Sequence, residues 1–136
     1  MRHSAAACIS ALTMALSGSV MAASFDGSEP LICATLEVQD CLPGAACEAE
    51  TLDDVDAPRF FRISVPDKKI TGTRPSGGGV DASIESIRHS KDMMFLQGAQ
   101  EAFAWNVVIG EADGKMVLTI ADNEDGIVVF GACAMR

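Results

Sequence analysis

The C-terminal stretch, residues 103–133, constrains the fold of this chain most strongly. It contains three runs rich in β-branched and aromatic residues, separated by the dipeptides Asp113-Gly114 and Asp125-Gly126. Asp-Gly between such runs is a strong signal for a β-hairpin, because both residues tolerate the positive φ that tight hairpin turns need. The chain is therefore expected to end in an antiparallel β-meander.

Runs of alternating or β-branched residues continue this pattern upstream. The further expected strands are residues 31–41, 60–65, 69–73, 80–89 and 93–100, and the chain turns after the first of them and returns through residues 47–51. Together they give seven or eight strands at roughly ten-residue spacing, with short turns and without helical periodicity. We predict an all-β fold, an antiparallel up-and-down meander that forms a small closed or nearly closed β-barrel, because closure removes exposed strand edges. A two-sheet β-sandwich is the alternative.

The alternation in residues 31–41 indicates a half-buried strand. Ile32, Ala34, Leu36 and Val38 fall on one face of it, whereas Cys33, Thr35 and the charged and polar side chains fall on the other. Successive side chains of a strand point to opposite faces of the sheet.

The first residues have the layout of a secretory signal peptide. Arg2 supplies positive charge, residues 5–20 are uncharged and mostly apolar, and Val20-Met21-Ala22 is a small-residue cleavage site. We expect residues 1–22 to be removed, leaving residues 23–136 as a single all-β domain that is periplasmic or secreted. Serine, threonine and glycine dilute the apolar run, so a membrane anchor fits less well, and no later segment is expected to span a membrane.

The chain is acidic. It has 10 basic and 19 acidic residues and a formal net charge of −9. This charge argues against nucleic acid and anionic membrane surfaces as partners, because both are negatively charged.

Four cysteines remain after removal of the signal peptide. They are Cys33, Cys41, Cys47 and Cys133. An even number in an exported protein indicates disulfides. A zinc site is the rival interpretation, but the spacing from Cys41 to Cys47 is wide and His89 is the one histidine in residues 23–136.

The predicted strands select one disulfide pairing. Cys33 and Cys41 lie eight residues apart on one strand, roughly 26 Å at the rise of a β-strand, whereas a disulfide needs Cα atoms within about 7 Å. Cys41 and Cys47 flank a turn and can pair across it. Cys33 is then left for Cys133, which barrel closure would bring alongside.

Apolar residues on the inward faces of the strands are the expected core anchors. They are Phe61, Ile63, Trp105, Val107, Leu118 and Phe130. Small eight-stranded barrels are often filled by their own side chains, so we expect a filled core in preference to a ligand cavity.

Several segments together carry a resemblance to a known group of proteins. They are Cys33, Cys41…Cys47, Pro58-Arg59-Phe60, Phe95-Leu96-Gln97-Gly98, Ala104-Trp105, Gly114–Thr119 and Val129–Cys133. In this order the chain resembles a family of small exported proteins of Gram-negative bacteria with four mature cysteines and no assigned function. The resemblance covers nearly all of residues 23–136 and implies no catalytic or binding residue.

Two loops have compositions that sometimes bind ions. Residues 74–79 are rich in glycine, but a strand follows where a phosphate-binding loop needs a helix, so we interpret them as a flexible hairpin loop. Residues 53–56 are acidic but lack the spacing of a calcium loop, and a solvated connector is the preferred interpretation.

No pattern of catalytic residues stands out, so we predict a non-enzymatic binding or interaction protein without cofactor or metal. Its expected partner is a small apolar ligand or another protein. A periplasmic protease or lysozyme inhibitor is the alternative, with the tip closed by Cys41 and Cys47 as the contact loop. A hydrolase using Asp122 and Asp125 is less favoured, because these residues resemble a solvated turn.

Overall fold

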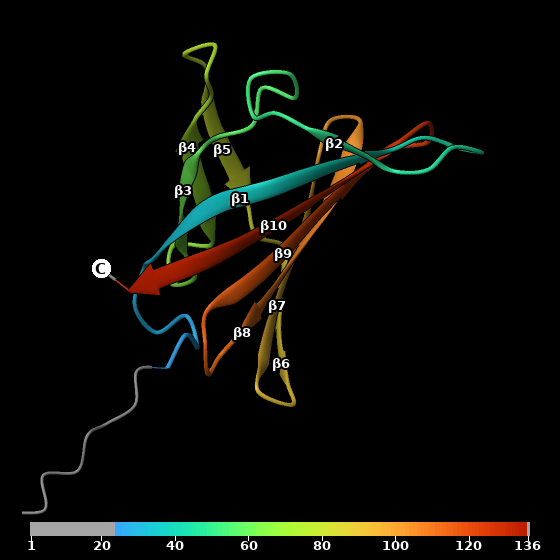
Figure 1. Cartoon of the computed structure of the whole chain (residues 1–136). Helices are drawn as coiled ribbons and strands as arrows, with labels where there is room; N and C mark the ends of the chain where they lie inside the picture. The colour runs from blue at the N-terminus through green and yellow to red at the C-terminus, as the bar shows by residue number, and fades with distance from the viewer. Residues whose placement is uncertain (1–23, 136) are drawn as a thin grey trace, which may run out of the picture.

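The computed structural model describes residues 24–135, and within them the chain is all-β (Figure 1). Its ten strands are β1 Leu31–Cys41, β2 Glu48–Glu50, β3 Phe60–Ser64, β4 Lys69–Thr73, β5 Gly79–Ser83, β6 Ser86–Ser90, β7 Met93–Gln100, β8 Phe103–Gly110, β9 Lys115–Ala121 and β10 Gly126–Met135. This confirms the predicted all-β class. The described residues include no helix long and apolar enough to cross a membrane.

The strands form one antiparallel sheet in the order β5-β4-β3-β1-β10-β9-β8-β7-β6, with β2 paired to the outer end of β1. The sheet is strongly curled into a half-barrel (Figure 1). The first and last long strands, β1 and β10, pair along their whole length. The meander is therefore wrapped back on itself, as predicted for a nearly closed barrel.

The two edges of the curled sheet are consecutive in sequence. The single strand expected over residues 80–89 is wrong: it is divided into β5 and β6 by Ile84 and Glu85. The amide of Ile84 donates to Lys68 O at 2.9 Å, whereas that of Glu85 donates to Gln97 O at 2.9 Å. Ile84 therefore bonds to the turn between β3 and β4, and Glu85 bonds to β7. The chain crosses from one edge of the sheet to the other between these two residues.

A β-bulge in β1 changes which residues face the interior. The pairing with β10 shifts between Thr35 and Glu37, so Leu36 is an extra residue. Leu31, Cys33 and Thr35 are buried before the bulge and Val38 is buried after it, whereas Leu36 is 72% exposed. The predicted grouping of Ile32, Ala34, Leu36 and Val38 on one face is therefore wrong, because a bulge reverses the alternation.

Two disulfides confirm the predicted pairing. Cys33 and Cys133 are direct partners across β1 and β10 and form a disulfide over a sequence separation of 100 residues. Cys41 and Cys47 close the loop between β1 and β2. The first joins the two ends of the meander and the second is local.

The two Asp-Gly turns are built differently. Gly114 has a φ of +67°, so this glycine supplies the left-handed conformation expected of it. Gly126 is already the first residue of β10 and pairs with Ala121. In that turn Asp122 Oδ1 instead accepts the amides of Glu124 at 2.7 Å and Asp125 at 3.0 Å.

One end of the half-barrel is filled by side chains. Its fully buried residues come from five strands: Leu31, Cys33, Ile63, Met94, Ile109 and Met116. The segment before β1 covers this end, since Phe25 N donates to Glu111 O at 2.9 Å. A Cβ on Gly27 would lie 2.7 Å from Val65 Cγ2, so this segment packs tightly against the barrel.

Candidate functional site

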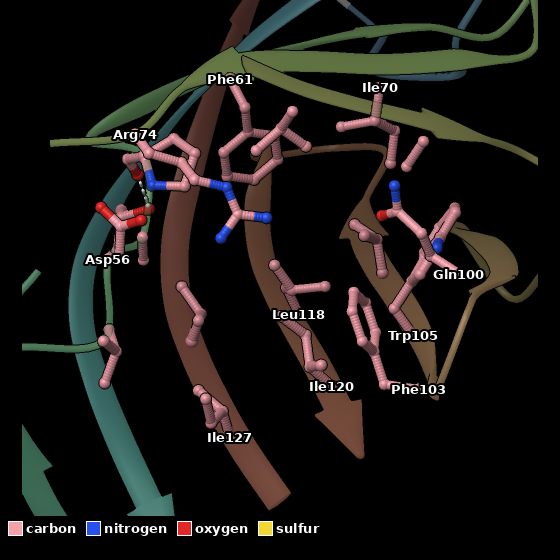
Figure 2. Close-up of a pocket in the computed structure, with 18 residues that line it drawn as sticks. Asp56, Phe61, Ile70, Arg74, Gln100, Phe103, Trp105, Leu118, Ile120 and Ile127 are labelled. Carbon is pink, nitrogen blue, oxygen red and sulfur yellow. Dashed lines mark hydrogen bonds between the residues drawn. The ribbon is translucent and has the colours of Figure 1, made fainter. Parts of the chain in front are cut away.

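The other end of the half-barrel is hollow. A cavity of about 130 Å³ lies between the inward faces of the strands and the loops at this end (Figure 2). Most of its wall is aliphatic or aromatic, including Phe61, Ile70, Val107, Leu118, Ile120 and Val129. The predicted filled core therefore holds for one half of the interior and is wrong for the other.

Five of the six expected core anchors are buried or partly buried, and four of them line this cavity. Ile63 and Val107 have no exposed surface, and Phe61 and Trp105 are each 6% exposed. Leu118 is partly buried and packs against the core. All but Ile63 also line the cavity. The same inward faces thus build the filled end and the wall of the hollow end.

Phe130 is the exception, and its assignment to the core is wrong. It is 42% exposed on the outer face of β10, whereas Val129 beside it is 2% exposed. Ile127 before Val129, and Gly131 and Cys133 after it, lie on the same inward face. Strict alternation along β10 therefore directs Phe130 to the outside.

Trp105 forms part of the cavity wall next to the opening of the barrel. It is the direct partner of Gly98 across β7 and β8, and its indole lies against the Gly98 backbone. Its Nε1 atom is buried and has no hydrogen-bond partner among residues 24–135. Buried donors are nearly always paired, because leaving one unpaired costs about 1–3 kcal/mol. The unpaired N–H of Trp105 is therefore an exception among buried donors and is available to a molecule in the cavity.

The loop between β2 and β3 forms one side of the cavity rim. It is a compact series of turns in which Ala57 N donates to Leu52 O at 2.9 Å. Thr35 Oγ1, inside the barrel, donates to Pro58 O at 2.8 Å and fastens the loop to β1. The acidic residues 53–56 were predicted to be a solvated connector, but Asp56 lies in the cavity lining.

Asp56 connects this loop to the β4–β5 hairpin. Its carboxylate accepts the amide of Ser76 at 3.0 Å and the hydroxyl of Ser76 at 2.8 Å. These two hydrogen bonds, the backbone one foremost, hold the pKa of Asp56 below its usual value, and the positive charge of Arg74 adds to the lowering. The carboxylate of Asp56, which its lowered pKa keeps ionised, therefore joins the two loops that form the cavity rim.

Arg74 and Gln100 are the polar residues that project over the apolar wall. Figure 2 shows the guanidinium of Arg74 directed into the cavity and the carboxamide of Gln100 on the opposite side. Gln100 Nε2 donates to Asp81 O at 3.4 Å. Within residues 24–135, no carboxylate lies within ion-pair distance of Arg74.

The acidic pair considered for hydrolysis lies elsewhere. Asp122 and Asp125 are in the β9–β10 turn and do not line the cavity. The two amide hydrogen bonds to Asp122 lower its pKa, the reverse of what a catalytic acid requires. In the described part of the chain, no three histidine, cysteine or acidic residues gather closely enough to hold a metal ion.

Arg74 and Gln100 line the cavity, although no sequence pattern indicated either as a site residue. Arg74 was treated as part of a flexible loop, and Gln100 as the end of a strand. Their positions were the usable signal, because Arg74 follows β4 and Gln100 ends β7 at the same end of the barrel. Their inward direction depends on how the hairpins fold over, which spacing alone does not specify.

Comparison with protein families, curated proteins and solved structures found no match for this chain. The resemblance to exported proteins of Gram-negative bacteria therefore stays a prediction.

Proposed function

We propose that this protein is a non-enzymatic binding protein whose half-barrel takes up a small apolar molecule in its hollow end. The observation that carries the proposal is the apolar cavity of about 130 Å³ with the unpaired Trp105 N–H in its wall. An apolar cavity of about 150 Å³ in another protein stays dry and binds benzene. The ligand body is therefore about the size of one six-membered ring.

The compartment belongs to the same proposal. Two disulfides in a small domain suit an oxidising environment such as the periplasm or the outside of the cell. The predicted signal peptide, residues 1–22, lies outside the described residues.

Trp105 makes the proposal directly testable, because it is the one tryptophan in the sequence. Titration with benzene, toluene and phenol should change its fluorescence in a saturable way. The variant Leu118→Phe would fill the cavity and should abolish this response while the far-ultraviolet circular dichroism stays that of the native protein. Ile127→Phe, at the rim, is a second filling variant. A native protein whose emission responds to none of these molecules contradicts the proposal.

A second candidate function rests on the loop closed by Cys41 and Cys47. The outer ends of β1 and β2 extend away from the curled part of the sheet (Figure 1), and Leu42 at their tip is 53% exposed. A short, cross-linked projection suits insertion into the cleft of another protein, as in a protease or lysozyme inhibitor. Inhibition assays with the native protein, Leu42→Asp and Cys41→Ala/Cys47→Ala would test it. Loss of inhibition in both variants is expected, and no inhibition by the native protein overturns it.

A further inference from the structure

The charges around the cavity make Arg74 unusual. The chain carries a net charge of −9, so its surface repels anions as a whole. Arg74 nevertheless directs a guanidinium over an apolar wall (Figure 2). A cation next to apolar surface loses hydration, and that loss is recovered only when the charge is paired.

The nearby acid, Asp56, interacts with the charge of Arg74 at a distance but forms no close ion pair with it. Asp56 shares the cavity lining with Arg74, but both of its oxygens are engaged by Ser76, at 3.0 and 2.8 Å. No residue from 24 to 135 offers Arg74 a carboxylate within ion-pair distance. The position of Arg74 is also fixed by its loop, since its amide donates to Gly78 O at 2.8 Å and its carbonyl accepts Gly77 N at 2.9 Å.

The cavity therefore offers an apolar wall, an unpaired N–H in the wall and, at the rim, a guanidinium without an ion-pair contact to any carboxylate of residues 24–135. The ionised carboxylate of Asp56 lies in the same lining but is hydrogen-bonded to Ser76. Guanidinium matches the planar geometry of a carboxylate and binds it through two parallel hydrogen bonds. The volume beneath leaves room for about one ring and no more.

We propose that the ligand is a small organic acid with a single-ring or similarly short apolar body, whose carboxylate pairs with Arg74 while its body fills the cavity. This inference rests on the proposed function of the same cavity and names the class of ligand. It also explains how an acidic protein attracts an anion, because Arg74 is the one Lys or Arg among the described residues that line the cavity.

Three probes with the same phenyl ring but different charges separate the contribution of the carboxylate from that of the apolar ring. They are phenylacetate, the neutral phenylacetamide and the cationic 2-phenylethylamine, each titrated against the intact protein with Trp105 fluorescence and calorimetry as readouts. Phenylacetate should bind at least about tenfold more tightly than phenylacetamide, as expected for one charge-assisted pair. The amine should bind more weakly than either, and added salt should weaken the binding of phenylacetate alone.

Two variants test whether Arg74 causes the preference for the acid over the amide. Arg74→Met keeps much of the apolar stem and should remove the preference for the acid over the amide. Arg88→Met makes the same change of charge at an exposed position of β6 and should leave the preference intact. Equal affinity of the native protein for acid and amide overturns the assignment of Arg74 but leaves an apolar ligand site standing. Failure of all three probes and of benzene to bind overturns the ligand site itself.

Discussion

Gly98 and Trp105 are direct partners across β7 and β8, and the indole of Trp105 occupies the space where a side chain at position 98 would lie. A Cβ at position 98 would also approach Ser83 O, at the end of β5, to within 2.6 Å. Because Gly98 has no side chain, both Trp105 in the cavity wall and Ser83 next to the crossing between the sheet edges pack against its backbone.

We predict that Gly98→Ala destabilises the fold by about 1–3 kcal/mol, the usual cost of overpacking. The methyl group would have to displace the indole or the backbone of β5. Gly79→Ala, in β5, is the matched control, because no atom lies within 4 Å of its added Cβ. Urea denaturation followed by circular dichroism measures both variants. A Gly98→Ala midpoint equal to that of Gly79→Ala would contradict the close packing.

Two aromatic residues should differ sharply on truncation. Trp105→Ala is expected to cost about 3–5 kcal/mol, because it empties a buried site. Phe130→Ala, on the outer face, should change the free energy of unfolding by less than about 1 kcal/mol. The difference in denaturant midpoint between the two variants is the measurement. A large loss for Phe130→Ala would restore it to the core and require a different register for β10.

The two disulfides should contribute unequally to stability. In the chain-entropy model a loop of about 100 residues is worth about 4.7 kcal/mol and the short tip about 2.4 kcal/mol. Cys33→Ala/Cys133→Ala should therefore lower the melting temperature more than Cys41→Ala/Cys47→Ala. Peptide mapping of the native protein under non-reducing conditions must first show the two pairs. A Cys33–Cys47 or Cys41–Cys133 peptide would disprove the pairing of β1 with β10.

Acid should weaken the turn between β9 and β10. The hydrogen bonds from Glu124 and Asp125 lower the pKa of Asp122 below its ordinary 3.8. A carboxyl whose pKa is lower in the folded state stabilises the fold above the unfolded-state pKa, and this stabilisation is lost as the pH falls through the folded-state value.

The variant Asp122→Asn should consequently melt earlier than the native protein at about pH 7, and the difference should shrink at about pH 3. Asp125→Asn is the control, because among residues 24–135 its carboxylate accepts no hydrogen bond. Thermal melts at both pH values provide the test, and a constant difference between Asp122→Asn and the native protein would count against it.

Much of the architecture was predictable because antiparallel hairpins are local. The run from Phe103 to Cys133 carries its own turns, and the pairing of β1 with β10 followed from the cysteines. The crossing at Ile84 and Glu85 was not predictable, because β-branched residues continue through it without a turn signal. The bulge at Leu36 was equally hidden, since an inserted residue changes the facing of every later side chain without changing the composition.

The cavity depended on a different kind of information. Phe61, Trp105 and Val107 were recognisable as inward-facing residues, but whether such residues meet or leave a space depends on the curvature of the sheet and on the loops that cover it. The hydrogen bonds between Asp56 and Ser76 join positions 20 residues apart in two loops, next to Arg74. No periodicity connects such positions, so sequence reasoning found the walls of the site and missed its charge.

The covalent link between Cys33 and Cys133 also determines how the molecule would respond to pulling. Tension applied between its two ends passes through the sulfur–sulfur bond and bypasses the 99 residues between the two cysteines, since their sequence separation is 100. The strands that enclose the cavity would stay unloaded while the short tails outside the link extend. In a single-molecule stretching experiment the oxidised protein should lengthen by little more than these tails, and a reducing agent should release the full contour of the barrel.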